Sequence, residues 1–143
     1  PVGKLPSSIR SWSLMKEEQS LFCGAAHPLF AVADKDISIK DLSKMRFAGR
    51  SYTSDTDLEV GIDFEWSAIA SHMESIALLI LSGGYIGYLP THYAEQSVRQ
   101  GKMRRLLSGQ TTYIDQFHLA HRQQERNSVA HRFVECVLKQ KAN

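Results

Sequence analysis

The stretch from Ala70 to Pro90, ASHMESIALLILSGGYIGYLP, constrains the fold more than any other part of the sequence. Apolar residues repeat at helical spacing from Met73 to Ile80, and the two glycines that follow can end a helix in the left-handed conformation. Tyr85–Leu89 is short and apolar, as is typical of a buried strand, and Pro90 ends it. Together with a strand ending at Ala70, these segments predict a βαβ unit, and open α/β sheets bind ligands at such strand-to-helix turns.

The start of the predicted helix is the first candidate ligand site. Ser71 and Glu74 have the spacing of a capping box, so Ser71 is predicted to cap the helix. Free backbone N–H groups and the positive end of the helix dipole at Ser71, His72 and Met73 would favour a carboxylate or phosphate. The alternative is that Ser71 only caps the helix and that His72 is an ordinary solvated histidine.

A second candidate lies after another predicted strand, Arg46–Tyr52. Ser51, Tyr52 and Thr53 carry hydroxyl groups that would face the same cleft, and ordinary turn hydrogen bonding is the alternative for each of them. The candidate ligand contacts are therefore Ser51, Tyr52, Thr53, Ser71, His72 and Met73.

The remaining segments alternate between strands and helices, which predicts an α/β fold. Pro1–Ser11 is expected to be loop, and the proline after His27 should break an extended segment because it excludes the helical conformation before it. Apolar residues on both faces of Tyr113–Ala120 predict a central strand. Gly109 is expected to turn the chain. The other predicted elements are an extended segment at Leu14–Ala25, a Ser38-capped helix at Ser38–Met45, a turn of helix at Leu58–Ile62, strands at Phe64–Ala70 and Met103–Leu107, and helices at His92–Gln100 and Ala130–Leu138.

The composition is that of a soluble globular protein of one domain or two small lobes. The chain has 143 residues, of which 43% are hydrophobic and 22% are charged. A net charge of +2 is too small to indicate a nucleic-acid surface. The longest apolar run is too short to span a bilayer, and Pro1–Arg10 lacks the apolar core of a signal peptide, so we expect no membrane contact.

Patterns for catalysis or metal binding are not found. The sequence has no G-x-S-x-G elbow, no HExxH motif and no Cys/His cluster. Cys23 and Cys136 fit no metal or redox spacing and are expected to be reduced packing residues. We therefore expect no catalytic residue, no cofactor and no metal site. The six histidines are scattered along the chain at His27, His72, His92, His118, His121 and His131.

Three blocks of sequence resemble the effector-binding domain of LysR-type transcriptional regulators. Leu21–Leu29 resembles a hydrophobic strand followed by a His-Pro-Leu break, with the Asp-Leu pair of Ile39–Leu42 after it. Ala70–Pro90 resembles the family's helix, glycine turn and G-x-G-I-x-x-LP strand. Ala94–Leu107, with Gly101, resembles the next helix, its G-x-L link and a short strand. The order and spacing of the blocks are more specific than any block alone.

The resemblance implies a fold like that of type 2 periplasmic binding proteins. It implies a Rossmann-like lobe with a mixed sheet at residues 26–112, and the strand and C-terminal helix of a second, incomplete lobe at 113–143. Residues 1–25 would be a remnant of lobe one and the crossover. The first part of lobe one and the winged helix-turn-helix domain would be missing, so we expect a fragment. Its exposed final helix and strand would favour dimerisation or segment exchange.

The resemblance also implies a function. A small-molecule effector, expected to be an anionic metabolite, would bind between two lobes in a cytoplasmic bacterial regulator. The protein would be a dimer or tetramer and would reach DNA only through the missing N-terminal domain. A periplasmic-type solute-binding protein is the first alternative, but it needs an export signal. A small α/β enzyme is the second, and the lack of a catalytic pattern argues against it.

Overall fold

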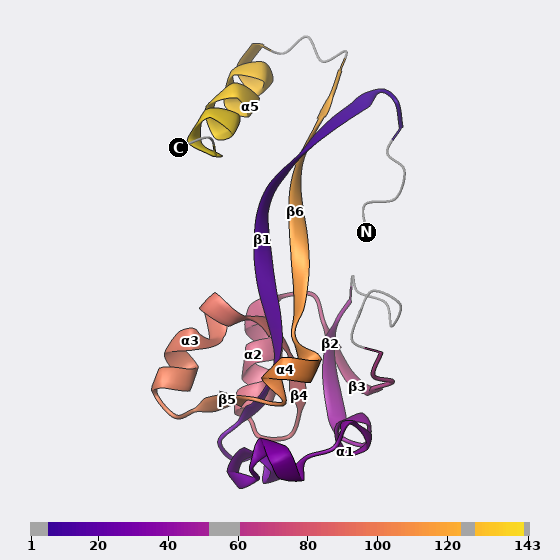
Figure 1. Ribbon diagram of the computed structural model, residues 1–143, viewed down its shortest axis with the longest axis vertical. Coiled ribbons are helices and arrows are strands. Elements are labelled where there is room, and N and C mark those ends of the chain that lie inside the picture. The colour runs from indigo at the N-terminus through magenta and orange to yellow at the C-terminus, as the bar shows by residue number, and fades with distance from the viewer. Residues whose placement is uncertain (1–5, 52–60, 124–127, 142–143) are drawn as a thin grey trace. The chain divides into compact units, whose positions relative to one another are not determined.

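The computed structural model describes residues 6–51, 61–123 and 128–141 (Figure 1). The chain divides into two compact units. The larger unit contains residues 18–114, and the smaller unit contains residues 1–17 and 115–143. Each unit is described by itself below.

The larger unit is built on a mixed sheet. Its strands are β1 (Ile9–Gly24), β2 (Arg46–Arg50), β3 (Glu65–Ala70), β4 (Ile86–Pro90) and β5 (Met103–Arg105). They lie in the order β3-β2-β4-β1-β5. β2 runs parallel to both β3 and β4, whereas β1 runs antiparallel to β4 and β5. The mixed α/β sheet expected from the sequence is confirmed.

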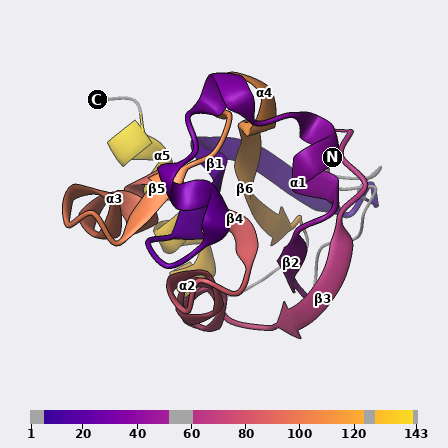
Figure 2. The same cartoon turned by 90° about the horizontal axis from the view of Figure 1, so that it is seen from below.

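Side chains alternate between two apolar layers, because neighbouring residues of a strand point to opposite faces of the sheet. In β1, Leu21 and Cys23 belong to one buried cluster and Phe22 to the other. Helices α2 (Met73–Leu81) and α3 (Thr91–Arg99) supply side chains to the cluster of Phe22. The opposite cluster contains Leu42 of α1 (Ile39–Ser43) and residues of the 3-10 turn η1 (Pro28–Ala31). Figure 2 shows α1 and α2 on opposite sides of the strands.

The predicted βαβ unit is confirmed. β3 leads into α2 and α2 into β4, and β2 lies between the two strands in the sheet. The glycine pair ends the helix as expected, with Gly83 in the left-handed region at a φ of 76°. All five residues of β4 are buried. The predicted ligand-binding turn between β3 and α2 is therefore followed by a well-packed helix and strand.

Several other predicted elements are also confirmed. Ser38 caps α1 in a full capping box with Asp41, and the hydrogen bonds from Ser38 hold the pKa of the Asp41 carboxyl below its usual value. The break at Pro28 and the ends of β3 and α3 lie close to their predicted positions. Gly101, at a φ of 67°, follows the end of α3.

Four local expectations are wrong. Ile9–Ser11 belong to β1 and not to a loop, because β1 pairs with β6 (Tyr113–Arg122) and the residue before this segment, Ser8, accepts from the Gln123 N–H. Gly61 and Ile62 are not helical, and the rest of that predicted turn lies outside the described residues. Gly109 lies inside the short helix α4 (Ser108–Thr111), and the left-handed residue at this bend is Leu107, with a φ of 47°. Cys136 is exposed, so it is not a packing residue.

The smaller unit contains the first part of β1, most of β6 and the helix α5 (Ser128–Lys141). The Gln123 N–H donates to the Ser8 carbonyl at 2.8 Å, and Gln116 Nε2 donates to the Met15 carbonyl at 2.7 Å, so the two strands run in opposite directions. β6 pairs with β1, and Phe117 is 47% exposed. The expectation of a central strand is therefore wrong, because apolar residues on both faces of β6 are not matched by burial on both faces.

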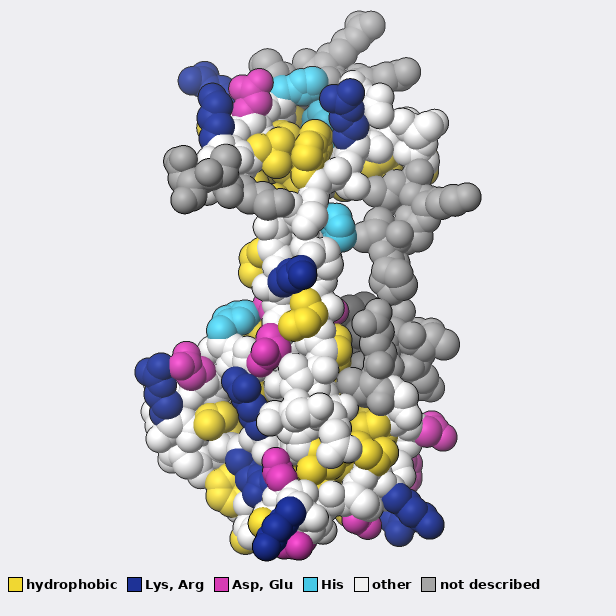
Figure 3. All heavy atoms as spheres, viewed as in Figure 1, with side chains coloured by type: hydrophobic (Ala, Val, Ile, Leu, Met, Phe, Trp, Pro, Cys, Tyr) yellow, Lys and Arg dark blue, Asp and Glu magenta, His cyan; other side chains and the backbone are white. Residues whose placement is uncertain are grey.

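The apolar stripe of the final helix is only partly covered. α5 has the predicted amphipathic pattern, and Val134, Val137 and Leu138 are half-buried. Phe133 is 60% exposed and Val129 is 73% exposed. Figure 3 shows apolar side chains on the visible surface of this unit, next to histidine side chains. The expected exposure of apolar surface is confirmed.

We predict that Gly83→Ala destabilises the protein more than Gly101→Ala. Both glycines have a positive φ, so each substitution incurs a backbone cost of about 1–2 kcal/mol. A Cβ at position 83 would also lie 2.6 Å from the Ala26 Cβ, whereas a Cβ at position 101 meets nothing within 4 Å. Urea unfolding of the two variants measures the difference. Equal losses would show that the contact with Ala26 relaxes without cost.

Candidate functional site

The carboxyl ends of β2 and β3 bring two of the predicted site segments together. Because these strands are parallel, Ser51 and Ser71 follow them at the same edge of the sheet. The Ser51 N–H donates to the Ala70 carbonyl at 3.1 Å, and Ser51 Oγ donates to Ser71 Oγ at 3.2 Å. Both serines are exposed. Tyr52 and Thr53, the other predicted contacts in this segment, lie outside the described residues.

The start of α2 differs from the predicted capping box. The N-cap is His72 and not Ser71, and its side chain makes no capping hydrogen bond. The helix begins one residue later than the serine–glutamate spacing requires, and the Ser71 hydroxyl accepts from Ser51 instead. His72 is exposed, while Met73 is half-buried and packs against the core beneath α2. The first turn of α2 therefore keeps backbone N–H groups that no described side chain caps.

An arginine at the same edge was missed by the sequence analysis. Arg50 is the last residue of β2 and directly precedes Ser51. Its guanidinium donates to Gln19 Oε1 at 3.4 Å and to the Tyr113 hydroxyl at 3.3 Å. Gln19 is fully buried in β1, opposite Pro90 at the end of β4. A basic residue that ends an apolar strand next to a predicted ligand contact was the available signal.

The residues next to Gln19 and Tyr113 in the sequence form another pair of polar side chains. Ser20, also fully buried, follows Gln19 in β1, and its hydroxyl lies 3.0 Å from the hydroxyl of Thr112. The edge thus combines a guanidinium, two exposed serine hydroxyls and the amino end of a helix. These groups donate hydrogen bonds or attract negative charge, which suits the binding of a small anion.

Cys23 and His27, a nucleophile and a base in the core of the larger unit, have structural roles. Burial raises the pKa of the Cys23 thiol to about 11, despite the opposing effect of Arg104, so the thiol stays protonated at neutral pH. His27 Nδ1 accepts from the Leu29 N–H at 3.1 Å, and burial lowers the pKa of this histidine. Neither residue has the arrangement of a catalytic group.

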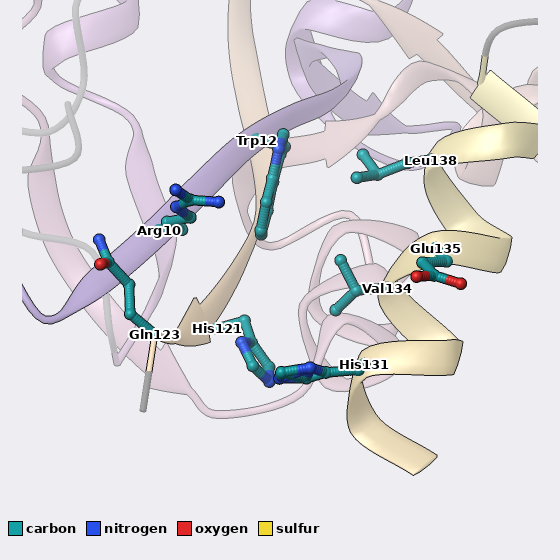
Figure 4. Close-up of a pocket in the computed structure, with 8 residues that line it drawn as sticks. All are labelled: Arg10, Trp12, His121, Gln123, His131, Val134, Glu135 and Leu138. Carbon is teal, nitrogen blue, oxygen red and sulfur yellow. The ribbon is translucent and has the colours of Figure 1, made fainter. Parts of the chain in front are cut away.

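Two histidines that are distant in the sequence meet in the smaller unit. The ring of His121, on β6, lies with its centroid 4.8 Å from that of His131, on α5. Both line a cavity with Arg10, Trp12 and Glu135 (Figure 4). The sequence pattern gives no sign of this pair, because its members lie ten positions apart on different secondary-structure elements. Within the described ranges, no three His, Cys, Asp or Glu side chains are grouped to hold a metal ion.

Across the part of the chain that the structure describes, no helix is both long enough and apolar enough to cross a membrane.

Comparison with known proteins gives consistent results. The family model of the LysR substrate binding domain matches residues 1–142. The HTH-type transcriptional activator BauR of Pseudomonas aeruginosa is 35% identical over an alignment 143 positions long. The alignment covers 95% of this chain and 47% of that protein. The chain therefore spans about half the length of this curated relative.

Solved structures with low sequence identity share the fold. The regulatory domain of CrgA from Neisseria meningitidis, a LysR-type transcriptional regulator, aligns with a TM-score of 0.72 at 18% identity, over 97% of this chain and 72% of that one. The regulatory domain of HypT from Salmonella typhimurium aligns with a TM-score of 0.70 at 15% identity, over 96% of this chain and 66% of that one.

We predict that Ser38→Ala destabilises the protein and that Ser71→Ala does not. Ser38 caps α1 through a hydrogen bond from the Asp41 N–H at 3.1 Å, and the loss of such a cap costs about 1 kcal/mol. Ser71 makes an exposed hydroxyl–hydroxyl bond, whose loss water replaces. Chemical unfolding measures both values. A comparable loss for Ser71→Ala would restore Ser71 as the cap of α2.

Proposed function

The chain belongs to the LysR substrate-binding domain family, and on this basis we propose that it is the effector-sensing domain of a bacterial LysR-type transcriptional regulator. Domains of this kind bind a ligand and do not catalyse a reaction. The relation to an activator of transcription and the shared fold of the regulatory domains support the proposal.

We propose that the effector is a small anion and that it binds at the edge formed by Arg50, Ser51 and Ser71. Arg50 is the observation that carries this proposal. A guanidinium carries a fixed positive charge and a planar fork of N–H donors, which is the geometry that binds a carboxylate. The serine hydroxyls and the N–H groups at His72 and Met73 would complete the contacts.

The proposed signal follows from a difference in affinity. An effector changes the protein only if it binds one arrangement more tightly than another. We propose that residues 26–112 form lobe two of the sensing domain, that residues 113–143 return to lobe one, and that residues 1–25 contain the crossover and a remnant of lobe one. Binding at the end of β2 would then bias the arrangement of the whole regulator.

We further propose that the regulator acts as a homodimer or homotetramer in the cytoplasm and contacts DNA through a separate N-terminal domain. Exposed apolar side chains, including Phe133 on α5 and Leu78 on α2 at 68% exposure, support association of copies. Size-exclusion chromatography with light scattering tests this. A monodisperse monomer at high concentration would contradict association of this chain.

The coding sequence of the whole protein tests the proposed function against its two alternatives. We expect a winged helix-turn-helix domain to precede the present residues. A signal peptide in that place would indicate an exported solute-binding protein, and neither feature would leave an α/β enzyme as the alternative.

We predict that Arg50→Met weakens effector binding by about tenfold to a hundredfold. Hydrogen bonds to a charged group are worth about 1.5–3 kcal/mol, and Arg50→Met removes them. The experiment screens small carboxylates by thermal shift and then measures the affinity of any hit by calorimetry. Arg50→Lys should retain part of the affinity because it keeps the charge without the planar fork.

Arg99→Met is the matched control for this experiment. Arg99 is an exposed arginine on α3 that pairs with Glu95 and lies outside the proposed site. The Arg99→Met variant should bind the carboxylate found in the screen with the affinity of the unmodified chain. Unchanged affinity in a folded Arg50→Met variant would remove Arg50 from the effector site without affecting the family assignment.

A further inference from the structure

The smaller unit contains a cavity that the proposed function does not use. Its volume is about 390 Å³ (Figure 4). Small-molecule sites have volumes of about 300–1,000 Å³ and combine apolar walls with a few polar groups. Residues of β1, β6 and α5 line the cavity, so segments distant in the sequence form its walls. The cavity is therefore large enough for a small organic ligand.

Three side chains form an apolar wall of this cavity. Trp12 lies on β1, and Val134 and Leu138 are four residues apart on α5, so the last two share one face of the helix. Figure 4 shows Val134 and Leu138 pointing from the helix toward the side of the cavity where Trp12 lies. All three side chains are half-buried. A flat or branched hydrocarbon group would bury apolar surface against this wall.

The basic residues of the cavity favour a negatively charged ligand. Arg10 lies two residues before Trp12 on β1, so both side chains point to the same face of the strand. The planar guanidinium has a fixed charge and two parallel N–H donors that match a carboxylate. His131, on α5, also lines the cavity and adds an N–H donor. The cavity thus combines a cationic group with an apolar wall.

One nitrogen at the cavity is buried without a partner. His121 lines the cavity, and its Nε2 is inaccessible to solvent and makes no hydrogen bond within the described residues. Such atoms are rare in folded proteins, because burial removes their hydrogen bonds to water. A turn of the imidazole about its side-chain bonds would let this nitrogen donate to an acceptor in the cavity. A bound anion would supply that acceptor.

One acidic residue also lines the cavity. Glu135 is exposed, and its carboxylate points away from the two histidines (Figure 4). Water and salt screen an exposed charge, so Glu135 opposes the binding of an anion only weakly.

We propose that this cavity binds a small carboxylic acid with an aromatic or branched aliphatic body. Arg10 would hold the carboxylate, the N–H groups of His121 and His131 would donate to it, and the apolar wall would contact the hydrocarbon body. The cavity belongs to the smaller unit, whereas Arg50 and Ser51 belong to the larger one. The proposed site is therefore separate from the proposed effector site and does not depend on it.

Titration with phenylacetate tests the proposal, and phenylacetamide serves as the uncharged control. The chain has two tryptophans, so its ¹H–¹⁵N NMR spectrum has two indole N–H signals, which a Trp12→Phe variant assigns. We expect phenylacetate to shift the Trp12 signal saturably. Phenylacetamide should bind at least about tenfold more weakly, because hydrogen bonds to charged groups change affinity by at least about this factor.

Arginine variants test which residue holds the carboxylate. Arg10→Met should weaken phenylacetate binding by at least about tenfold, and it should remain folded because Arg10 is exposed. Arg122→Met is the matched control. Arg122 is an exposed arginine that follows His121 on β6, so its side chain points to the opposite face of the strand. The Arg122→Met variant should bind phenylacetate with the affinity of the unmodified chain.

Several results would overturn the proposal. One is the lack of a saturable shift of the Trp12 signal, and another is a shift of the Trp66 signal alone, which would place the acid in the larger unit. Equal affinity for phenylacetate and phenylacetamide, or an unchanged affinity in the folded Arg10→Met variant, would also do so. A loss of affinity in Glu135→Gln would contradict an anionic ligand. Binding by this chain that disappears in the whole regulator would show that another segment fills the cavity there.

Discussion

The close packing of α2 on the sheet determines where its first turn lies relative to the carboxyl ends of β2 and β3. A Cβ at Gly24 would be 2.2 Å from the Ile80 carbonyl oxygen, and a Cβ at Gly87 would be 3.2 Å from Ile80 Cδ1. Both glycines therefore allow α2 to approach the sheet closely. Because Ile76 and Ile80 are fully buried against the sheet, α2 has little freedom to slide along it.

The geometry of the proposed effector site follows from this packing. With α2 fixed, its first turn lies beside the ends of β2 and β3, and the parallel register places Arg50 opposite Ala70. Ser51 and Ser71 then come within hydrogen-bond distance although 20 residues separate them. A rigid scaffold that carries exposed polar groups at one edge is the usual arrangement of ligand sites in α/β folds.

Local patterns predicted the elements that depend on local interactions. The apolar spacing in Met73–Ile80, the glycines after it and the Ser38 cap were recognisable because each involves residues close in sequence. The start of α2 was not, since the same polar residues fit a helix beginning after Ser71 or after His72. The Ser71 hydroxyl accepts a hydrogen bond from Ser51, which follows β2 and is distant in the sequence, so a local pattern does not show it.

Contacts between segments distant in the sequence could not be predicted from local sequence patterns. Arg50 reaches Gln19 and Tyr113 across 31 and 63 residues, and no periodicity records such a pairing. The pairing of His121 with His131 depends on how α5 packs within the smaller unit. β6 was misjudged for a related reason: apolar residues on both faces indicate what a strand can bury, whereas its neighbours decide what it does bury.

The partners of Arg50 also indicate how binding of an anion would affect other parts of the protein. Gln19 belongs to β1 and Tyr113 to β6, and these two strands continue from the larger unit into the smaller one. An anion that draws the guanidinium toward itself would compete with both hydrogen bonds, which are already long at 3.4 and 3.3 Å. Under the proposed function, the effector would therefore act directly on the two strands through which the larger unit is connected to the rest of the chain. An effector that bound only the serine hydroxyls would lack this route, because neither Ser51 nor Ser71 lies on those strands.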